Sequence, residues 1–403
     1  MAVAQEGLRA QDESGRLWSR GFALAWLGNF LHSAGFHAYV HLPGWIEQRG
    51  AGEVLIGVLI AVMAVAAVLL RPVVGRVMDT RGRKVVMIVG GVVHIVATLA
   101  YLLVDTLPGK PWAAIAAVRV VHGFAEAALF SVLFTYAADL IPAERRAQGI
   151  GLFGISGILP LALGGMLGDW VIVDGDYRGL FFTTTAMALG GLLVTLPLAE
   201  TRRGSGPGRS FAAAAAAVEL RSLWFIGVVF AMGLAAYFVF LKTYLLAEPA
   251  IGTMGMFFGA YALAAVVLRV TLGWLPERIG MMRVLVPALV LASCGLATLA
   301  VAEQPLHLVV SGLLCGVGHG FAFPIISAMV VTRARPDERG SAIALFTALF
   351  DLGLLLGGPT FGLAVRLVGY GGCFVLAGSL VLVATVIFSI WERALAPSLK
   401  RDT

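Results

Sequence analysis

Residues 71–84 read Arg-Pro-Val-Val-Gly-Arg-Val-Met-Asp-Thr-Arg-Gly-Arg-Lys, and residues 269–283 repeat the pattern as Arg-Val-Thr-Leu-Gly-Trp-Leu-Pro-Glu-Arg-Ile-Gly-Met-Met-Arg. In each stretch an arginine is followed by a glycine, an acidic residue and a second glycine at nearly the same spacing. Both stretches lie between long apolar runs. The chain is therefore predicted to be built from a duplicated unit.

The composition indicates that this duplicated unit lies in a membrane. Hydrophobic residues make up 59% of the chain and charged residues only 13%, whereas a soluble domain has about a quarter charged residues. The mean hydropathy is +0.92. Because a helix needs about 20 mostly apolar residues to cross the hydrocarbon core, the sequence predicts an all-α membrane protein with twelve spans. These spans are expected at residues 20–42, 54–75, 85–104, 112–138, 148–171, 179–199, 222–246, 252–274, 284–302, 306–331, 341–367 and 372–391.

The positions of the cations predict the orientation of the spans. With the N-terminus in the cytoplasm, only Arg49, Lys110, Arg178 and Arg366 fall in segments on the opposite side, while most of the 29 basic residues lie on the cytoplasmic side. Cytoplasmic segments are the ones that carry excess lysine and arginine. Both termini are therefore expected to be cytoplasmic. Because the arginines are spread over many loops, the net charge of +6 does not predict a nucleic-acid groove.

The twelve spans divide into two groups of six. We expect a polar N-terminal segment at 1–19, a six-helix bundle at 20–199, a cytoplasmic linker at 200–221, a second six-helix bundle at 222–393 and a tail at 394–403. The linker is polar at its start and ends in a run of alanines, a composition that favours a flexible connection followed by a short helix.

The loop motif and the spans together resemble a known family. Gly75-Arg76-x-x-Asp79-x-Arg81-Gly82-Arg83-Lys84 is similar to the signature loop of the major facilitator superfamily, with its altered copy between spans eight and nine. Arg119-x-x-x-Gly123 in span four resembles a second family feature, although His122 stands where a glutamine is more usual. The resemblance implies two pseudo-symmetric six-helix bundles that rock around a midplane site, in the inner membrane of a bacterium.

Span four contains the first candidates for proton coupling. Charges inside spans are costly and therefore point to function, and Arg119, His122 and Glu126 lie within an arc of about 60° on one helical face. We expect Glu126 to carry the proton and His122 to relay it. The alternative is a static Arg119–Glu126 ion pair that only holds span four to a neighbour. Asp351, within span eleven, is the second candidate carrier, with a structural role as its alternative.

Other polar and aromatic side chains are candidates for the substrate cavity. The resemblance places spans one, four, seven and ten around this cavity. The candidates are Asn29, His32, Tyr237, His319 and Phe323. For the histidines, a hydrogen bond to a neighbouring helix is the alternative role.

The repeated loop is expected to form a cytoplasmic gate. Asp79 follows span two among several cations, and a carboxylate there can join helix ends or cap the N-terminus of a helix from the other half. Arg71 is expected to snorkel or to join that network. A solvated loop that merely obeys the charge rule is the alternative. The residues assigned to the gate are Arg71, Gly75, Asp79, Arg83, Gly273 and Glu277.

Enzyme chemistry is not expected. The sequence shows no phosphate-binding loop with its lysine and hydroxyl, no paired histidines at metal spacing and no nucleophile with a base. The three cysteines suggest neither a disulfide framework nor a metal site. No catalytic residue, metal or cofactor is therefore assigned. The expected partners are a small-molecule substrate, protons and membrane lipid, with no nucleic acid, and the chain is expected to act as a monomer.

The predicted function is secondary active export of a small organic compound, a drug or metabolite, in exchange for protons by alternating access. Exporters of the resembled family share a glycine-rich span five with a Gly-Pro dipeptide. Here span five is glycine-rich without the dipeptide, which occurs instead in span eleven as Gly358-Pro359. A structural role for both spans remains the alternative, as do import or facilitated diffusion and a non-transporting receptor of transporter fold.

Overall fold

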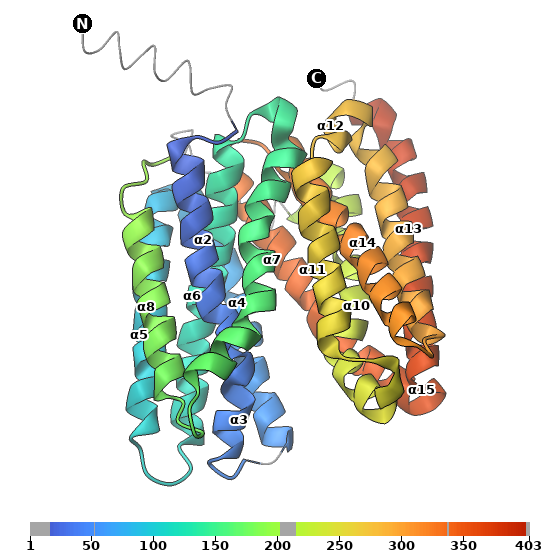
Figure 1. The fold of residues 1–403 in the computed structure, drawn as a ribbon. Helices are drawn as coiled ribbons and strands as arrows, with labels where there is room; N and C mark the ends of the chain where they lie inside the picture. Colours follow the sequence, from blue (N-terminus) through green and yellow to red (C-terminus); the bar gives the residue numbers. More distant parts are fainter. Residues whose placement is uncertain (1–16, 52, 202–214, 337, 400–403) are drawn as a thin grey trace, which may run out of the picture. The chain divides into compact units, whose positions relative to one another are not determined.

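The computed structural model describes residues 17–51, 53–201, 215–336 and 338–399, and within these the chain is helical apart from turns and connections (Figure 1). The predicted segment 1–19, the linker 200–221 and the tail 394–403 therefore lie largely or partly outside the described residues. The long helices are α2 (Arg20–Ala38), α4 (Glu53–Arg81), α5 (Arg83–Asp105), α6 (Trp112–Leu140), α7 (Arg146–Val171), α8 (Arg178–Thr195), α10 (Val218–Ala247), α11 (Met254–Thr271), α13 (Met281–Ala300), α14 (Pro305–Arg333) and α15 (Arg339–Leu399). Short helices connect them: α3 (Leu42–Glu47), α12 (Leu275–Ile279) and the 3-10 turns η1 (Tyr39–His41), η2 (Ala143–Arg145) and η3 (Pro249–Ile251).

Among the described residues, nine helices are long and apolar enough to cross a membrane. One of these is α15, which covers the last two predicted spans and contains a non-helical Gly369 with φ 72° and ψ 179°. Large apolar side chains remain exposed along the helices, as at Leu69 (70%) and Leu103 (70%). Such surfaces suit lipid rather than water. The count of twelve spans remains a prediction.

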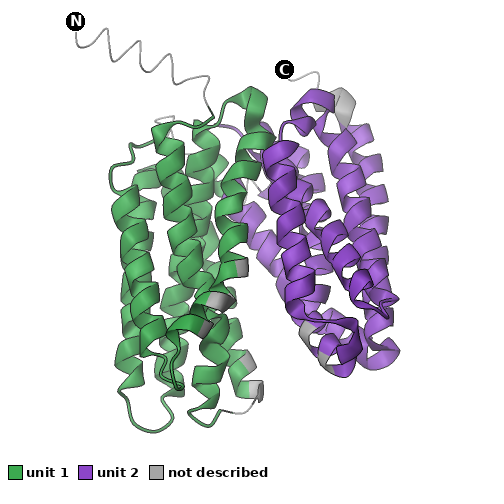
Figure 2. Ribbon diagram, in the orientation of Figure 1, with its two compact units in different colours: residues 1–208, 339–341 green, residues 209–338, 342–403 purple. Residues whose placement is uncertain are grey.

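The chain forms two compact units, coloured separately in Figure 2. Unit 1 contains residues 1–208 and 339–341, and unit 2 contains residues 209–338 and 342–403. In unit 1 helices α4 and α5 both pack against α6, and in unit 2 helices α11 and α13 both pack against α14. The same arrangement of three helices thus occurs in each unit, as the duplication predicts.

Glycines bring the backbones of these central helices close together. In unit 1 a Cβ built on Gly123 of α6 would lie 2.4 Å from the carbonyl oxygen of Met63 on α4. In unit 2 a Cβ on Gly312 or Gly316 of α14 would lie 2.4 or 2.3 Å from the carbonyl oxygens of Phe257 and Tyr261 on α11. Only glycine fits such contacts, which are favoured where helices associate in lipid.

The repeated loop differs from its expected shape in one respect. Asp79 does not follow the helix but lies inside α4, which continues to Arg81. The helix extends beyond the apolar run because the backbone hydrogen bonds of a helix are internal, so residues 76–81 can continue it outside the apolar region. It ends at Gly82, whose φ of 103° few other residues adopt. Gly280 has a φ of 104° at the same point of the repeat, just before α13.

Candidate functional site

Arg119 and Glu126 of α6 both contact α4. Arg119 is 5% exposed, and its guanidinium donates hydrogen bonds to the carbonyl oxygens of Leu59 (3.2 Å) and Ile60 (2.8 Å). Arg119 therefore binds the backbone of α4 rather than Glu126, its partner in the expected alternative. Both residues do lie on one face, but this face is directed at α4, so each finds its partner there.

The carboxylate of Glu126 pairs with Arg71 of α4. Nη2 of Arg71 lies 3.1 Å from Oε1 and 3.3 Å from Oε2 of Glu126. The Arg71 side chain is fully buried, whereas that of Glu126 is 22% exposed. The guanidinium of Arg71 also lies 5.5 Å from the ring centre of Phe130. Arg71 thus does not snorkel to water but holds an ion pair of which only the acidic member is accessible.

Unit 2 contains the counterpart of this pair without its carboxylate. The tetrapeptide His122-Gly-Phe-Ala of α6 recurs as His319-Gly-Phe-Ala in α14, so Phe323 occupies the position of Glu126. Arg269 of α11, the counterpart of Arg71, is 2% exposed. It donates to the carbonyl oxygens of Gly320 (3.0 Å) and His319 (3.5 Å). The two units therefore share the arginine and differ in the acid.

Histidines from three helices meet inside unit 1. Nδ1 of His32 on α2 lies 3.0 Å from Nδ1 of His94 on α5, so one of the two nitrogens donates a proton to the other. The ring of His94 stacks on that of His122 at 5.3 Å between centres. Phe36 stacks on both His94 and His122. Among the described residues no group of three or more such side chains is arranged to hold a metal ion. His94 is not among the site residues predicted from the sequence.

Asn29, the remaining cavity candidate of the first unit, is buried at 6%. Its side-chain amide donates to Oγ of Ser156 on α7 at 2.7 Å. This bond ties α2 to α7. The candidate residue thus has a structural partner within its own unit.

The candidates of the second half cluster in unit 2. The hydroxyl of Tyr261 hydrogen-bonds to Nδ1 of His319. Tyr237 packs against Tyr261 with ring centres 5.9 Å apart, and Phe323 lies 6.0 Å from His319 by the same measure. Asp351 is half-buried on α15. Unit 2 therefore brings Tyr237, His319 and Phe323 into one aromatic cluster.

Asp79 joins three segments of unit 1. Its carboxylate accepts hydrogen bonds from the backbone N–H groups of Gly340 (3.0 Å) and Ser341 (2.7 Å), in the first turn of α15. It also accepts from Arg83 at 3.2 Å. Arg83 in turn donates to Asp139 at the end of α6, at 3.2 Å. A carboxylate is favourable at a helix N-terminus because the backbone N–H groups there lack partners.

The N-terminus of α5, directly after Gly82, is fixed by Glu200. The two carboxylate oxygens of Glu200 accept from the backbone N–H groups of Arg83 (2.9 Å) and Lys84 (3.0 Å). Asp139 and Glu200 were not predicted from the sequence. The signal for Asp139 was its position in the last turn of α6, whereas Glu200 lies beyond the end of α8 and had no such signal.

The other gate candidates, Gly75, Gly273 and Glu277, lie in or next to the helices of the two repeats. Gly75 lies within α4. Gly273 lies in the turn between α11 and α12, and Glu277 lies in the first turn of α12. Residues 269–279 of the second copy are thus divided between α11 and α12, whereas residues 71–81 of the first copy are continuous within α4.

Comparison with known proteins places these features in a family. The family model described as Major Facilitator Superfamily matches residues 21–248 and 223–403. A protein of Escherichia coli strain K12 described as the MFS-type transporter YhhS is 25% identical over 352 residues, covering 86% of each chain. The Salmonella typhimurium protein described as the MFS-type transporter STM4428 is 26% identical over 370 residues, covering 88% of this chain and 92% of its own.

Solved structures share the fold. The human organic anion transporter MFSD10 superimposes with a TM-score of 0.81 at 19% identity, covering 92% of this chain and 99% of its own. A bacterial homologue of the iron transporter ferroportin, in an outward-facing state, gives 0.77 at 17% identity, covering 93% and 100%.

Proposed function

Because the chain belongs to the major facilitator superfamily, and is thus an integral membrane transporter of a small-molecule substrate rather than an enzyme, we propose that it exports a small organic compound in exchange for protons. In this proposal both termini face the cytoplasm of a bacterial cell, and the protein works as a monomer by alternating access. The apolar helices and the excess of cations in the segments assigned to the cytoplasm support this orientation.

The ion pair between Arg71 and Glu126 carries the proposal. The repeat-related helices α11 and α14 pack through glycines as α4 and α6 do, yet they contain Phe323 where α6 contains Glu126. Packing of this helix pair therefore does not require a carboxylate. An ionisable residue inside a span is costly and is retained where it has a function. The partial exposure of Glu126 gives a proton access to it.

Proton uptake would act through this pair. Protonation of Glu126 removes its negative charge and so weakens its ion pair with the buried cation of Arg71, which is costly in a low-dielectric interior. The site is then less favourable for a substrate that needs the paired state. His122, one turn before Glu126 on α6, supports a relay role, and Asp351 is the second candidate carrier. Each proton that enters supplies about 2.3 kcal/mol per 100 mV of membrane potential.

Inverted membrane vesicles containing the protein test this function. The vesicle interior is acidified, a pH-sensitive dye reports the gradient, and cationic, zwitterionic and anionic organic compounds are added in turn. The compounds span several classes because the structural relatives are described with different substrates, an organic anion for one and iron for another. We expect at least one compound to discharge the gradient in the wild type.

The decisive variant is Glu126→Gln, which keeps the shape of the side chain and removes its charge. We expect it to abolish discharge of the gradient while the protein still folds. Glu303→Gln, at an exposed carboxylate after α13, is the matched control and should transport as the wild type does. Discharge by E126Q equal to that of the wild type would show that Glu126 does not carry the proton. Equilibration of a compound without any proton flux would favour facilitated diffusion.

A further inference from the structure

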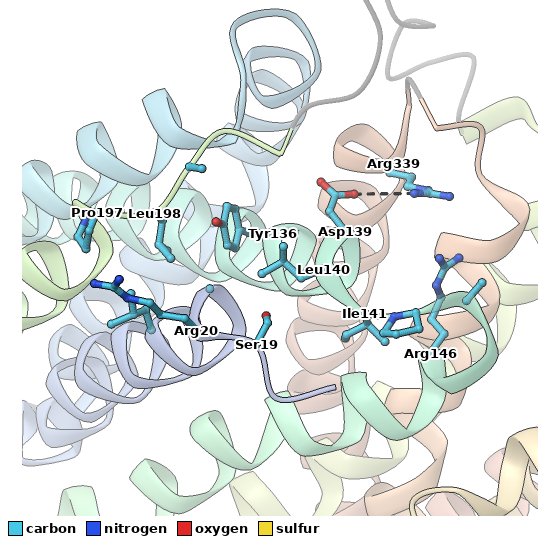
Figure 3. Close-up of a pocket in the computed structure, with 15 residues that line it drawn as sticks. Ser19, Arg20, Tyr136, Asp139, Leu140, Ile141, Arg146, Pro197, Leu198 and Arg339 are labelled. Atoms are coloured by element: carbon cyan, nitrogen blue, oxygen red, sulfur yellow. Dashed lines mark ion pairs between the residues drawn. The ribbon is translucent and has the colours of Figure 1, made fainter. Parts of the chain in front are cut away.

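A pocket lined by both charged and apolar side chains lies at the end of unit 1 that contains Asp79 (Figure 3). Its volume is about 720 Å³, within the range of about 300–1,000 Å³ that small-molecule sites occupy. The walls come from the first turn of α2, the last turn of α6, the start of α7, the segment 197–199 and Arg339. Neither Arg71 nor Glu126 lines it, so this pocket is separate from the proposed proton site.

The charges around the pocket are mostly positive. Arg20, Arg146 and Arg339 line it, with Asp139 as the acidic member. Asp139 is already engaged, because its Oδ2 accepts from Arg83 at 3.2 Å and from the hydroxyl of Thr201 at 3.0 Å. Its other oxygen lies 3.9 Å from Arg339. One carboxylate shared with Arg83 leaves the pocket with an excess of positive charge.

Arg146 is the cation that most needs a partner. It is only 8% exposed, and among the described residues its Nε has no hydrogen-bond partner. Burial and the neighbouring positive charge of Arg339 both disfavour its charged form, whereas Asp139 and Glu144 act in the opposite direction. In Figure 3 its side chain rises from the start of α7 toward Arg339. A buried cation with an unused donor is costly unless an anion completes its bonds.

Two helix N-termini add to the positive field. Helix α2 begins at Arg20 and α7 begins at Arg146, and both residues line the pocket. The N-terminal end of a helix carries a partial positive charge and unpaired N–H groups, which favour a bound anion.

We propose that this pocket binds a phosphate ester, with the phosphate group between Arg146 and Arg339. The planar fork of a guanidinium matches the oxygens of a phosphate, and two such forks can share one group. The volume leaves room for the rest of the molecule toward Arg20. The phosphate ester is either the headgroup of an anionic phospholipid or a soluble phosphate compound. The proposal does not depend on the direction or the proton coupling of transport.

Ligand-dependent stability of the purified full chain tests the proposal and separates the two sources. The thermal unfolding midpoint is measured in nanodiscs of phosphatidylcholine, in nanodiscs that also contain phosphatidylglycerol, and in phosphatidylcholine nanodiscs titrated with inorganic phosphate or glycerol phosphate at constant ionic strength. A ligand that binds only the folded chain raises the midpoint. Stabilisation by phosphatidylglycerol alone would identify a lipid site, and stabilisation by the soluble phosphates would identify a soluble ligand.

Arg146→Gln is the test variant and Arg145→Gln the matched control. The two variants have the same net charge, but Arg145 does not line the pocket and its Nε donates to the side chain of Gln148. We expect R146Q to bind about tenfold more weakly or worse, as loss of a charge-assisted bond implies, and R145Q to bind as the wild type does. Arg20→Gln, at an exposed position, gives a second and smaller loss if R146Q does not fold. Stabilisation by neither ligand, or equal binding by R146Q and R145Q, would overturn the proposal.

Discussion

Replacement of Asp79 by asparagine tests the cap on α15 most directly. The Asp79 side chain is 2% exposed, and it receives two backbone N–H groups and one guanidinium. A hydrogen bond to a charged group contributes about 1.5–3 kcal/mol, against about 1 kcal/mol for a neutral one. Asparagine keeps a single acceptor oxygen, so one backbone N–H loses its acceptor. Arg83 also loses the negative charge with which it pairs. We expect the first turn of α15 to be destabilised by about 3 kcal/mol.

Amide hydrogen exchange measures this loss where it occurs. A decrease of about 3 kcal/mol in the free energy of local opening corresponds to exchange about a hundredfold faster. The amides of Gly340 and Ser341, which bond to the carboxylate, should show the increase in peptides followed by mass spectrometry. Asp105→Asn is the control, because Asp105 lies at the opposite end of α5 and accepts from Trp45 and Arg178. Unchanged exchange in D79N, or an equal increase in D105N, would refute the cap.

Two further substitutions test the packing and the ion pair of unit 1. Gly123→Ala should lower stability by about 1–3 kcal/mol, because its Cβ would meet a backbone carbonyl of α4. Gly157→Ala is the control and should be tolerated, because a Cβ there meets nothing within 4 Å. Equal thermal unfolding midpoints for the two variants would contradict the close contact of Gly123 with α4. Arg71→Met should cost about 2 kcal/mol, less than a fully buried pair because Glu126 is partly exposed. Adding Glu126→Gln should recover part of that loss in a double-mutant cycle, and strict additivity would mean that the two side chains do not interact.

Much of the architecture could be predicted from the sequence. Apolar runs of membrane length gave the helices, and the repeat of Arg71 to Gly82 at Arg269 to Gly280 gave two related units. The family was confirmed by comparison. The positions of helix ends were harder to predict. Asp79 shows why, because a helix can continue beyond its apolar run wherever its residues permit.

Partners of the charged side chains were harder to predict. The spacing of Arg119 and Glu126 correctly placed both on one face of α6, but it did not say which helix that face meets. Because this face meets α4, Arg119 donates hydrogen bonds to backbone carbonyls of α4 and Glu126 pairs with Arg71. Periodicity describes one helix at a time, whereas a pairing depends on the rotation of two. The recurrence of His122-Gly-Phe-Ala at His319 was the signal that would have aligned α6 with α14 and exposed the difference between Glu126 and Phe323.

The glycine contacts also have a mechanical consequence. Where Gly123 touches α4 and Gly316 touches α11, backbone meets backbone with no compressible side chain between them. Closely packed interiors yield little and transmit strain. We therefore expect the two helices of each pair to move together, so that a displacement of one helix is transmitted to the other.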